Sequence, residues 1–169
     1  MKQLFIILFL IASTGVAFAQ AAKPSGEELH WYTDLMKANE QSRLTKKPVF
    51  AFFTGSDWCG WCMKLQNEVF SKKAFVKWAK EKVILLELDF PRRKQLAPEL
   101  AQQNNGLQQA FQVQGFPTVW MFFAEQDKAT NKLNITPLGS CGYPQGAEAG
   151  HEEVKFLADA NAILAKIPK

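Results

Sequence analysis

The sequence is poor in the residues that disulfide-stapled and metal-binding domains depend on. Its 169 residues include three cysteines and two histidines. Three cysteines are too few to build a disulfide scaffold. A structural zinc site needs about four ligands, and beyond Cys59 and Cys62 the chain offers only Cys141, His30 and His151. A zinc-binding domain is therefore the weaker alternative, no metal site is expected, and no cofactor is expected.

Strongly clustered charge, internal repeats and low-complexity segments are also missing. The formal net charge is +4, with basic residues spread along the chain. The basic run at 91–94 reads most simply as a solvated loop. Such a distribution predicts no binding to nucleic acid or to an anionic membrane surface.

No apolar run reaches the roughly 20 residues that a helix needs to cross a bilayer. The run from Leu4 to Ala12 follows Lys2 and precedes Ala17-Phe18-Ala19. A basic start, a short apolar stretch and an A-x-A-like site are typical of a secretory signal peptide. We therefore predict a signal peptide at residues 1–19, cleaved after Ala19. No cysteine lies beside this site, which excludes a lipid-modified cysteine there.

After cleavage, the remaining length suits one domain. Residues 20–26 form a short polar lead-in, and residues 27–169 are expected to form a single domain. We expect no stable membrane insertion of this mature chain.

The most informative stretch is Trp58-Cys59-Gly60-Trp61-Cys62, which follows the apolar run 48–53. This context predicts a strand, a turn and a helix, with Cys59 at the helix N-terminus and Cys62 one turn further on. Unpaired N–H groups and the helix dipole favour a thiolate at Cys59. Cys62 would be less exposed and would resolve a mixed disulfide by attacking it.

Two other interpretations of the pair are weaker. A structural bridge across so short a loop removes little entropy from the unfolded chain. A zinc half-site lacks a convincing second half, as the ligand count shows. The spacing therefore favours a redox-active dithiol.

Apolar periodicity predicts alternating helices and strands along the mature chain. Helices are expected at 27–44, 59–70, 72–80 with Ser71 as N-cap, 98–111 with an interruption at 104–106, and 152–167. Strands are expected at 48–53, 83–89, 119–123 and 133–138. Strand–helix–strand crossovers imply parallel pairing and the last two strands an antiparallel hairpin. The predicted fold class is α/β, a small mixed central sheet flanked by helices on both faces, with an added N-terminal helix.

A second motif, Gly115-Phe116-Pro117-Thr118, precedes the strand at 119–123. Together with Trp58-Cys59-Gly60-Trp61-Cys62 after an apolar strand, it resembles the thioredoxin family over residues 31–167. The resemblance implies a thioredoxin fold, a cis bond before Pro117, attack by Cys59 and resolution by Cys62. It also implies a substrate groove framed by Trp58, Gly60, Trp61, Phe116 and Pro117.

The sequence departs from the family pattern at two positions. Trp61 stands where thioredoxins carry proline, and it either offers apolar surface to a bound polypeptide or packs against neighbouring loops. Phe53 stands at the position matched to a buried aspartate that takes the proton of the resolving thiol. Water, Asp57 or Glu87 would take that proton instead, or that step is slower. Asp57 is equally suited to capping the turn.

The resemblance implies an exported thiol–disulfide oxidoreductase that exchanges disulfides with protein cysteines, in a direction left open. Its partners would be protein thiols and disulfides, and a redox partner protein that the sequence does not identify. The bacterial periplasm is the first expected location and the extracellular space the second. The alternative is a polypeptide-binding, chaperone-like module. Cys141 is expected to be a small buried residue rather than a third redox partner.

Overall fold

The computed structural model describes residues 28–127, 129–130 and 133–167, so the predicted signal peptide and lead-in lie outside the described residues. A mixed sheet of five strands has the order β1-β3-β2-β4-β5. Its strands are β1 (Trp31–Tyr32), β2 (Val49–Thr54), β3 (Ile84–Asp89), β4 (Thr118–Gln126) and β5 (Leu133–Cys141). The pairs β1–β3 and β2–β3 are parallel, while β2–β4 and β4–β5 are antiparallel. The predicted mixed sheet and terminal hairpin are both confirmed.

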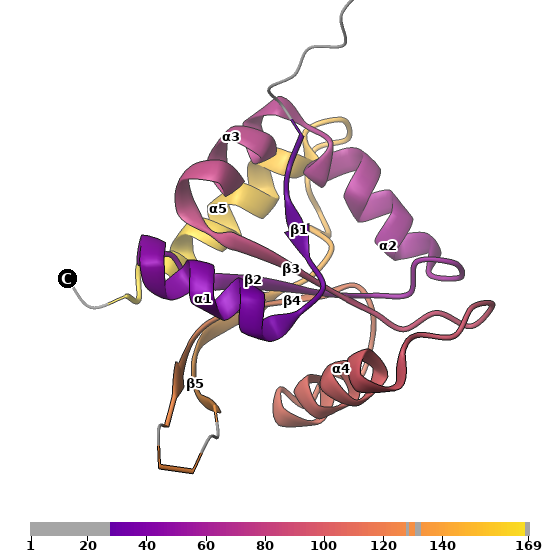
Figure 1. Cartoon of the computed structure of the whole chain (residues 1–169). Helices are drawn as coiled ribbons and strands as arrows, with labels where there is room; N and C mark the ends of the chain where they lie inside the picture. The colour runs from indigo at the N-terminus through magenta and orange to yellow at the C-terminus, as the bar shows by residue number, and fades with distance from the viewer. Residues whose placement is uncertain (1–27, 128, 131–132, 168–169) are drawn as a thin grey trace, which may run out of the picture.

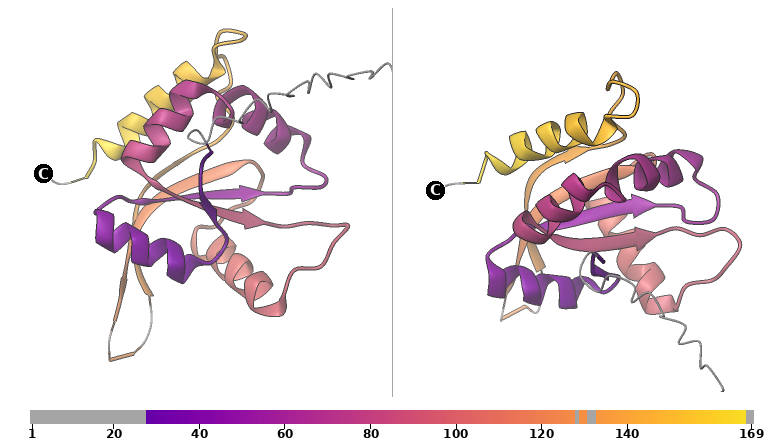
Figure 2. Two further views of the ribbon diagram at one scale, coloured as in Figure 1. Left: turned by 45° about the horizontal axis from the view of Figure 1, so that its top comes forward. Right: turned by 90° about the horizontal axis from the view of Figure 1, so that it is seen from above.

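Helices cover both faces of this sheet (Figures 1 and 2). One face carries α2 (Gly60–Leu65) with its π-helical continuation η1 (Gln66–Phe70), α3 (Lys73–Lys82) and α5 (Glu152–Leu164). The other carries α1 (Leu35–Thr45) and α4 (Pro98–Ala110). The β4–β5 hairpin extends beyond the body of the sheet (Figure 1).

The hydrophobic core is split by the sheet into two clusters. All six residues of β2 are buried, which explains its continuous rather than alternating apolar sequence. Phe50 and Phe52 pack on the side of α2, α3 and α5, in one cluster with Cys59 and Cys62. Phe53 belongs to the second cluster, on the side of α1 and α4. The dithiol therefore lies over one face of the central strand.

The chain begins differently from the prediction of a helix from residue 27. Trp31 and Tyr32 form β1 and pair with Leu85 and Leu86 of β3. The helix starts only after Asp34, whose Oδ1 accepts hydrogen bonds from the backbone N–H groups of Met36 and Lys37 at 2.7 and 3.2 Å. Such an N-cap sets the helix start. The aromatic side chain of Trp31 is free to pack on the core instead.

Two predicted helix features are wrong. Helix α4 is continuous through 104–106, because Asn104 is buried and its Nδ2 donates to the Asp89 carbonyl at 2.9 Å. Ser71 does not cap α3, where Lys72 occupies the N-cap position. The Ser71 hydroxyl instead donates to the Asn67 carbonyl at 2.6 Å and closes η1.

Hydrophobic periodicity predicts Val154, Leu157, Ala158, Ile163 and Leu164 on the buried face of α5, and this prediction is only partly right. Ile163 is buried and Leu157 and Leu164 pack against the core, but Val154 and Ala158 are exposed. Phe156, Ala160 and Ile163 face the core, whereas Val154 is 61% exposed. The aromatic ring of Phe156 joins the cluster around Phe50, at a centroid distance of 6.2 Å. Among the described residues, no helix is long and apolar enough to span a bilayer.

Candidate active site

The dithiol is positioned by a tight turn between β2 and α2. The backbone N–H groups of Trp58 and Cys59 both donate to the Gly55 carbonyl, at 3.2 and 2.8 Å. A Cβ atom on residue 55 would lie 2.5 Å from Trp58 Nε1, so only glycine fits beneath the indole. The turn delivers Cys59 to the N-cap position of α2.

Cys59 and Cys62 form a disulfide with an S–S distance of 2.08 Å and a Cα–Cα distance of 5.2 Å. The Cys62 backbone N–H donates to Cys59 Sγ at 3.2 Å. Cys59 is 5% exposed and Cys62 is fully buried. An N–H group at the start of a helix stabilises negative charge on the sulfur it points to. The arrangement suits Cys59 as the attacking thiolate and Cys62 as the resolving thiol.

The second motif lies against the same cluster. The Phe116–Pro117 peptide bond is cis, as the resemblance implied. Phe116 packs on the cluster that contains both cysteines, and its ring centroid is 6.0 Å from that of Trp58. A Cβ on Gly142 would lie 3.2 Å from the Pro117 carbonyl oxygen, so the segment after β5 also borders this loop. The structure thus brings Trp58, Phe116 and Pro117 to one side of the dithiol.

Trp61 contacts Tyr143, a residue that the sequence reasoning missed. The two rings meet edge to face at a centroid distance of 5.0 Å. Lys64 Nζ lies 5.0 Å from both ring centroids and 4.0 Å from Glu68, and the Tyr143 hydroxyl donates to Glu68. A hydrogen bond with Tyr143 raises the pKa of Lys64. Trp61 still remains 54% exposed.

The packing interpretation of Trp61 is therefore confirmed. Its exposed surface is compatible with contact to a polypeptide, and that contact stays a prediction. The sequence signal for Tyr143 was weak: it is an aromatic residue in a glycine-rich segment. The contact joins residues far apart in the sequence, so no local pattern could have placed it.

Asp57 anchors the loop that follows β3. Its carboxylate accepts hydrogen bonds from the backbone N–H of Arg92, at 3.0 and 3.2 Å, and from that of Arg93 at 2.7 Å. The hydrogen bond from Arg92 is the main cause that lowers the Asp57 pKa. A carboxylate with a lowered pKa is a weaker proton acceptor. The geometry therefore favours the anchoring role over the proton shuttle.

Three more contacts join the same two segments. The Trp58 Nε1–H donates to the Phe90 carbonyl at 2.7 Å. The Arg92 guanidinium lies over the Trp58 ring, 3.8 Å from its centroid. Ser56 donates to Asp89 from its backbone N–H at 2.8 Å and from its hydroxyl at 2.7 Å. The turn before Cys59 and the loop 90–94 are therefore held together as one unit.

Glu87 lies on the dithiol side of the sheet. It pairs in register with Phe52, which packs in the cysteine-containing cluster, and partners in a parallel ladder share a face. Burial raises the Glu87 pKa, with a further contribution from the charge of Asp89. Phe53, matched earlier to the buried aspartate of the family, packs on the opposite face. That match is corrected: Phe52 is the β2 side chain that faces the dithiol, and Glu87 is its lateral neighbour.

Cys141 is half-buried against the same core cluster, at the end of β5. Burial, with a smaller contribution from Asp159, raises the pKa of its thiol to about 12. A thiol with so high a pKa is almost entirely protonated at neutral pH and is a poor nucleophile. Within the described part of the chain, no group of three or more His, Cys, Asp or Glu side chains is arranged to hold a metal ion.

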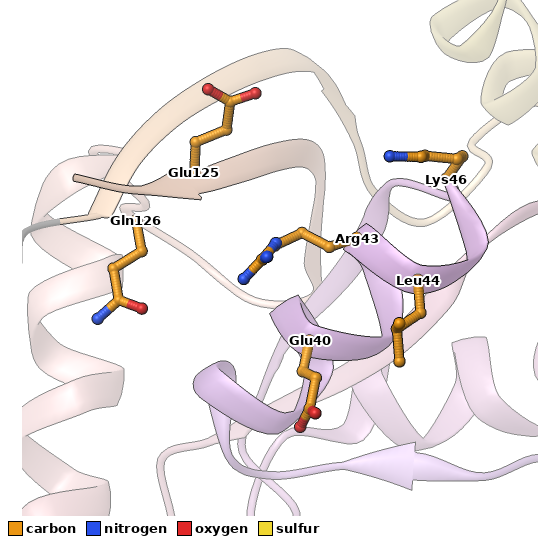
Figure 3. Close-up of a pocket in the computed structure, with 6 residues that line it drawn as sticks. All are labelled: Glu40, Arg43, Leu44, Lys46, Glu125 and Gln126. Carbon is orange, nitrogen blue, oxygen red and sulfur yellow. The ribbon is translucent and has the colours of Figure 1, made fainter. Parts of the chain in front are cut away.

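A hollow of about 510 Å³ lies at the opposite end of the sheet, between the C-terminal end of α1 and the end of β4 (Figure 3). Figure 3 shows Arg43 reaching from the helix toward the strand. The lining carries both charge signs, from Glu40, Arg43, Lys46 and Glu125, and contains no cysteine. The candidate active site is therefore the dithiol and not this hollow.

A dithiol at a strand–helix junction, facing a cis-proline loop over a mixed sheet, defines a thioredoxin-like protein. The sequence profile of the thioredoxin-like domain family matches residues 35–131. The chain therefore belongs to the thioredoxin-like family.

Among its relatives is the disulfide bond reductase DsbH of Chlamydia pneumoniae, 30% identical over 131 residues, which are 78% of each protein. The thioredoxin-related protein DsbJ of the same organism is 25% identical over 97% of this chain, although the match spans only 45% of DsbJ.

Solved structures agree on the fold. A DsbH oxidoreductase structure matches with a TM-score of 0.66 and 28% identity, covering 90% of this chain and 95% of the other. A thioredoxin from Thermus thermophilus matches with a TM-score of 0.56 and 14% identity, over 82% and 88% of the two chains. The second likeness is evidence for the fold alone.

Proposed function

We propose that this protein is an exported thiol–disulfide oxidoreductase that reduces disulfide bonds in protein substrates. The observation that carries the proposal is the Cys59–Cys62 pair, with the more exposed sulfur receiving a backbone N–H at a helix start. The relative named as a disulfide bond reductase supports the reducing direction.

The reaction starts from the reduced pair. The Cys59 thiolate attacks one sulfur of the substrate disulfide, that bond breaks, and one substrate sulfur leaves as a thiolate. Cys62 then loses its proton and attacks Cys59 Sγ. The second substrate thiol is released and the Cys59–Cys62 disulfide forms, so two electrons pass from the protein to its substrate. A redox partner protein must supply two electrons to begin the next cycle.

Glu87 supports a proposal for the proton acceptor of Cys62. It is the carboxylate beside Phe52 on the dithiol face, and its raised pKa makes it a better base than Asp57. Replacement by glutamine should slow the release of substrate from the mixed disulfide without slowing its formation. A rapid-mixing experiment that finds both steps unchanged would remove Glu87 from the mechanism.

Insulin reduction tests the main proposal. The wild-type protein should accelerate the precipitation of insulin chains in dithiothreitol, and Cys59→Ser should give only the uncatalysed rate. Cys141→Ser is the matched control and should match the wild type, because the Cys141 thiol is protonated and half-buried. Equal activity of wild type and Cys59→Ser would end the proposal.

A second candidate function rests on exposed apolar surface beside the dithiol. Trp61 is 54% exposed and Met63 43% exposed. Such surface suits a module that holds unfolded polypeptide, with the dithiol incidental. In that case the double variant Cys59→Ser, Cys62→Ser would suppress aggregation of a cysteine-free client as well as the wild type does. If neither protein suppresses aggregation, this candidate is excluded.

Export is proposed from residues 1–19 alone. The basic start, apolar run and A-x-A-like end support a secretory signal. Fusion of residues 1–25 to alkaline phosphatase, which is active only after export, should give enzyme activity in a bacterial host. A fusion that starts at residue 20 is the control, and equal activity of the two would contradict the proposal.

A further inference from the structure

Arg92 places a positive charge at the rim of the dithiol. Its guanidinium lies 3.8 Å from the ring centroid of Trp58, and Trp58 directly precedes Cys59. The Arg92 side chain is exposed, so one face of the guanidinium covers the indole while its edges remain open to solvent.

This position is held from two directions. The Arg92 backbone N–H donates to the Asp57 carboxylate, and the Trp58 indole below it donates to the Phe90 carbonyl at 2.7 Å. A guanidinium stacked on an aromatic ring keeps its planar fork of N–H donors and loses less side-chain freedom when it binds. The cation is therefore organised before any substrate arrives.

Within the described part of the chain, the Arg92 guanidinium stacks on Trp58 but has no acidic partner. Of the neighbouring cations, Lys94 pairs with Asp89 at 3.1 Å and Lys64 with Glu68 at 4.0 Å. No ion pair involves the Arg92 side chain among the residues that the structure describes. The Asp57 carboxylate is occupied by backbone N–H groups of the loop.

We propose that Arg92 recognises a carboxylate of the substrate polypeptide beside the cysteine under attack. The inference rests on the proposed function and names its substrate class: protein disulfides flanked by Asp or Glu. Because the guanidinium covers the residue before Cys59, a bound chain whose sulfur reaches Cys59 brings its neighbouring side chains to Arg92. A carboxylate matches the paired N–H donors of the guanidinium in geometry and charge.

Matched peptide disulfides test this assignment. Two self-quenched disulfide peptides, amidated at the C-terminus, differ only by Asp or Asn next to each cysteine. The wild-type protein, kept reduced by dithiothreitol, should reduce the Asp peptide about two to five times faster in kcat/KM at low salt, the range expected of an exposed ion pair. The preference should fade in about 0.5 M salt, where charges are screened within a few ångströms.

Variants of the loop identify the residue responsible. In Arg92→Gln the ratio between the two peptides should fall to about one, and in Arg92→Lys part of it should remain. Arg93→Gln removes the same charge one residue further on and should keep the wild-type ratio. Equal rates of the wild type on both peptides, or an equal loss of preference in Arg93→Gln, would overturn the assignment of Arg92. Failure to reduce either peptide would instead overturn the proposed function itself.

Discussion

Replacing Gly55 by alanine tests how tightly the turn before the dithiol is built. The new Cβ would lie 2.5 Å from Trp58 Nε1 and 2.8 Å from Cζ2. Real Cβ contacts are longer, so the indole must move away. It is held by the hydrogen bond to the Phe90 carbonyl, by contact with Phe116 and by the Arg92 guanidinium.

The expected cost follows from those three contacts. A hydrogen bond contributes about 0.5–1.5 kcal/mol, an aromatic pair about 0.5–1.5 kcal/mol, and an exposed cation–π contact about 0.5–1 kcal/mol. Movement of the indole weakens all three together. We expect Gly55→Ala to lower the free energy of unfolding by about 2–4 kcal/mol.

Urea unfolding of the oxidised protein, followed by circular dichroism, measures this change. Gly106→Ala is the matched control, because Gly106 lies inside α4 and nothing stands within 4 Å of an added Cβ. That control should gain about 0.5–1 kcal/mol from helix propensity. A Gly55→Ala protein within about 0.5 kcal/mol of wild type, a loss smaller than one hydrogen bond, would refute the packing described for Trp58.

Three further predictions concern the rest of the site. Burial raises the Glu87 pKa, so its ionised form opposes folding: stability is fully present at acid pH and is lost as pH rises through the folded pKa. Glu87→Gln should therefore be more stable than wild type at pH 7 and equal to it below the ordinary glutamate pKa; an equal gain at both pH values in urea unfolding contradicts this. Tyr143→Phe, which loses the hydrogen bond to Glu68 but keeps the ring against Trp61, should lower the free energy of unfolding by about 1 kcal/mol. Iodide quenching of tryptophan fluorescence should stay at the wild-type level in Tyr143→Phe and rise in Tyr143→Ala, and a rise in both would show that the ring does not shield Trp61. Cys62→Ser should accumulate a mixed disulfide with substrate on non-reducing gels, because Cys59 attacks but nothing resolves the product; Cys59→Ser should accumulate none.

Most of the fold could be read from local patterns. The apolar run at 48–53 predicted the strand β2, and the helix expected to end at 44 ends at Thr45. The first strand could not be found this way. Trp31 and Tyr32 show helical spacing with Leu35, but Asp34 caps a later helix start and the two residues pair with β3 instead. Pairing with β3, more than fifty residues further along the chain, therefore outweighs the local helical pattern at Trp31 and Tyr32.

At the candidate active site, too, local patterns identified some features and tertiary contacts decided others. The spacing of Cys59 and Cys62 and the motif at Pro117 identified both halves of the dithiol centre. The match of Phe53 to a buried acid was wrong because residue alternation along β2 places Phe52, and not Phe53, over the cysteines. A change of one position in a strand moves a side chain to the other face.

The sequence by itself determined the dithiol on which the proposed chemistry rests, because two cysteines within one helical turn need only local geometry to meet. The tertiary structure alone decided what surrounds them. Tyr143 reaches Trp61, Arg92 covers Trp58, and Glu87 comes to lie beside Phe52. These neighbours lie more than thirty residues apart in the chain, so strand order and helix placement, not sequence spacing, bring them together.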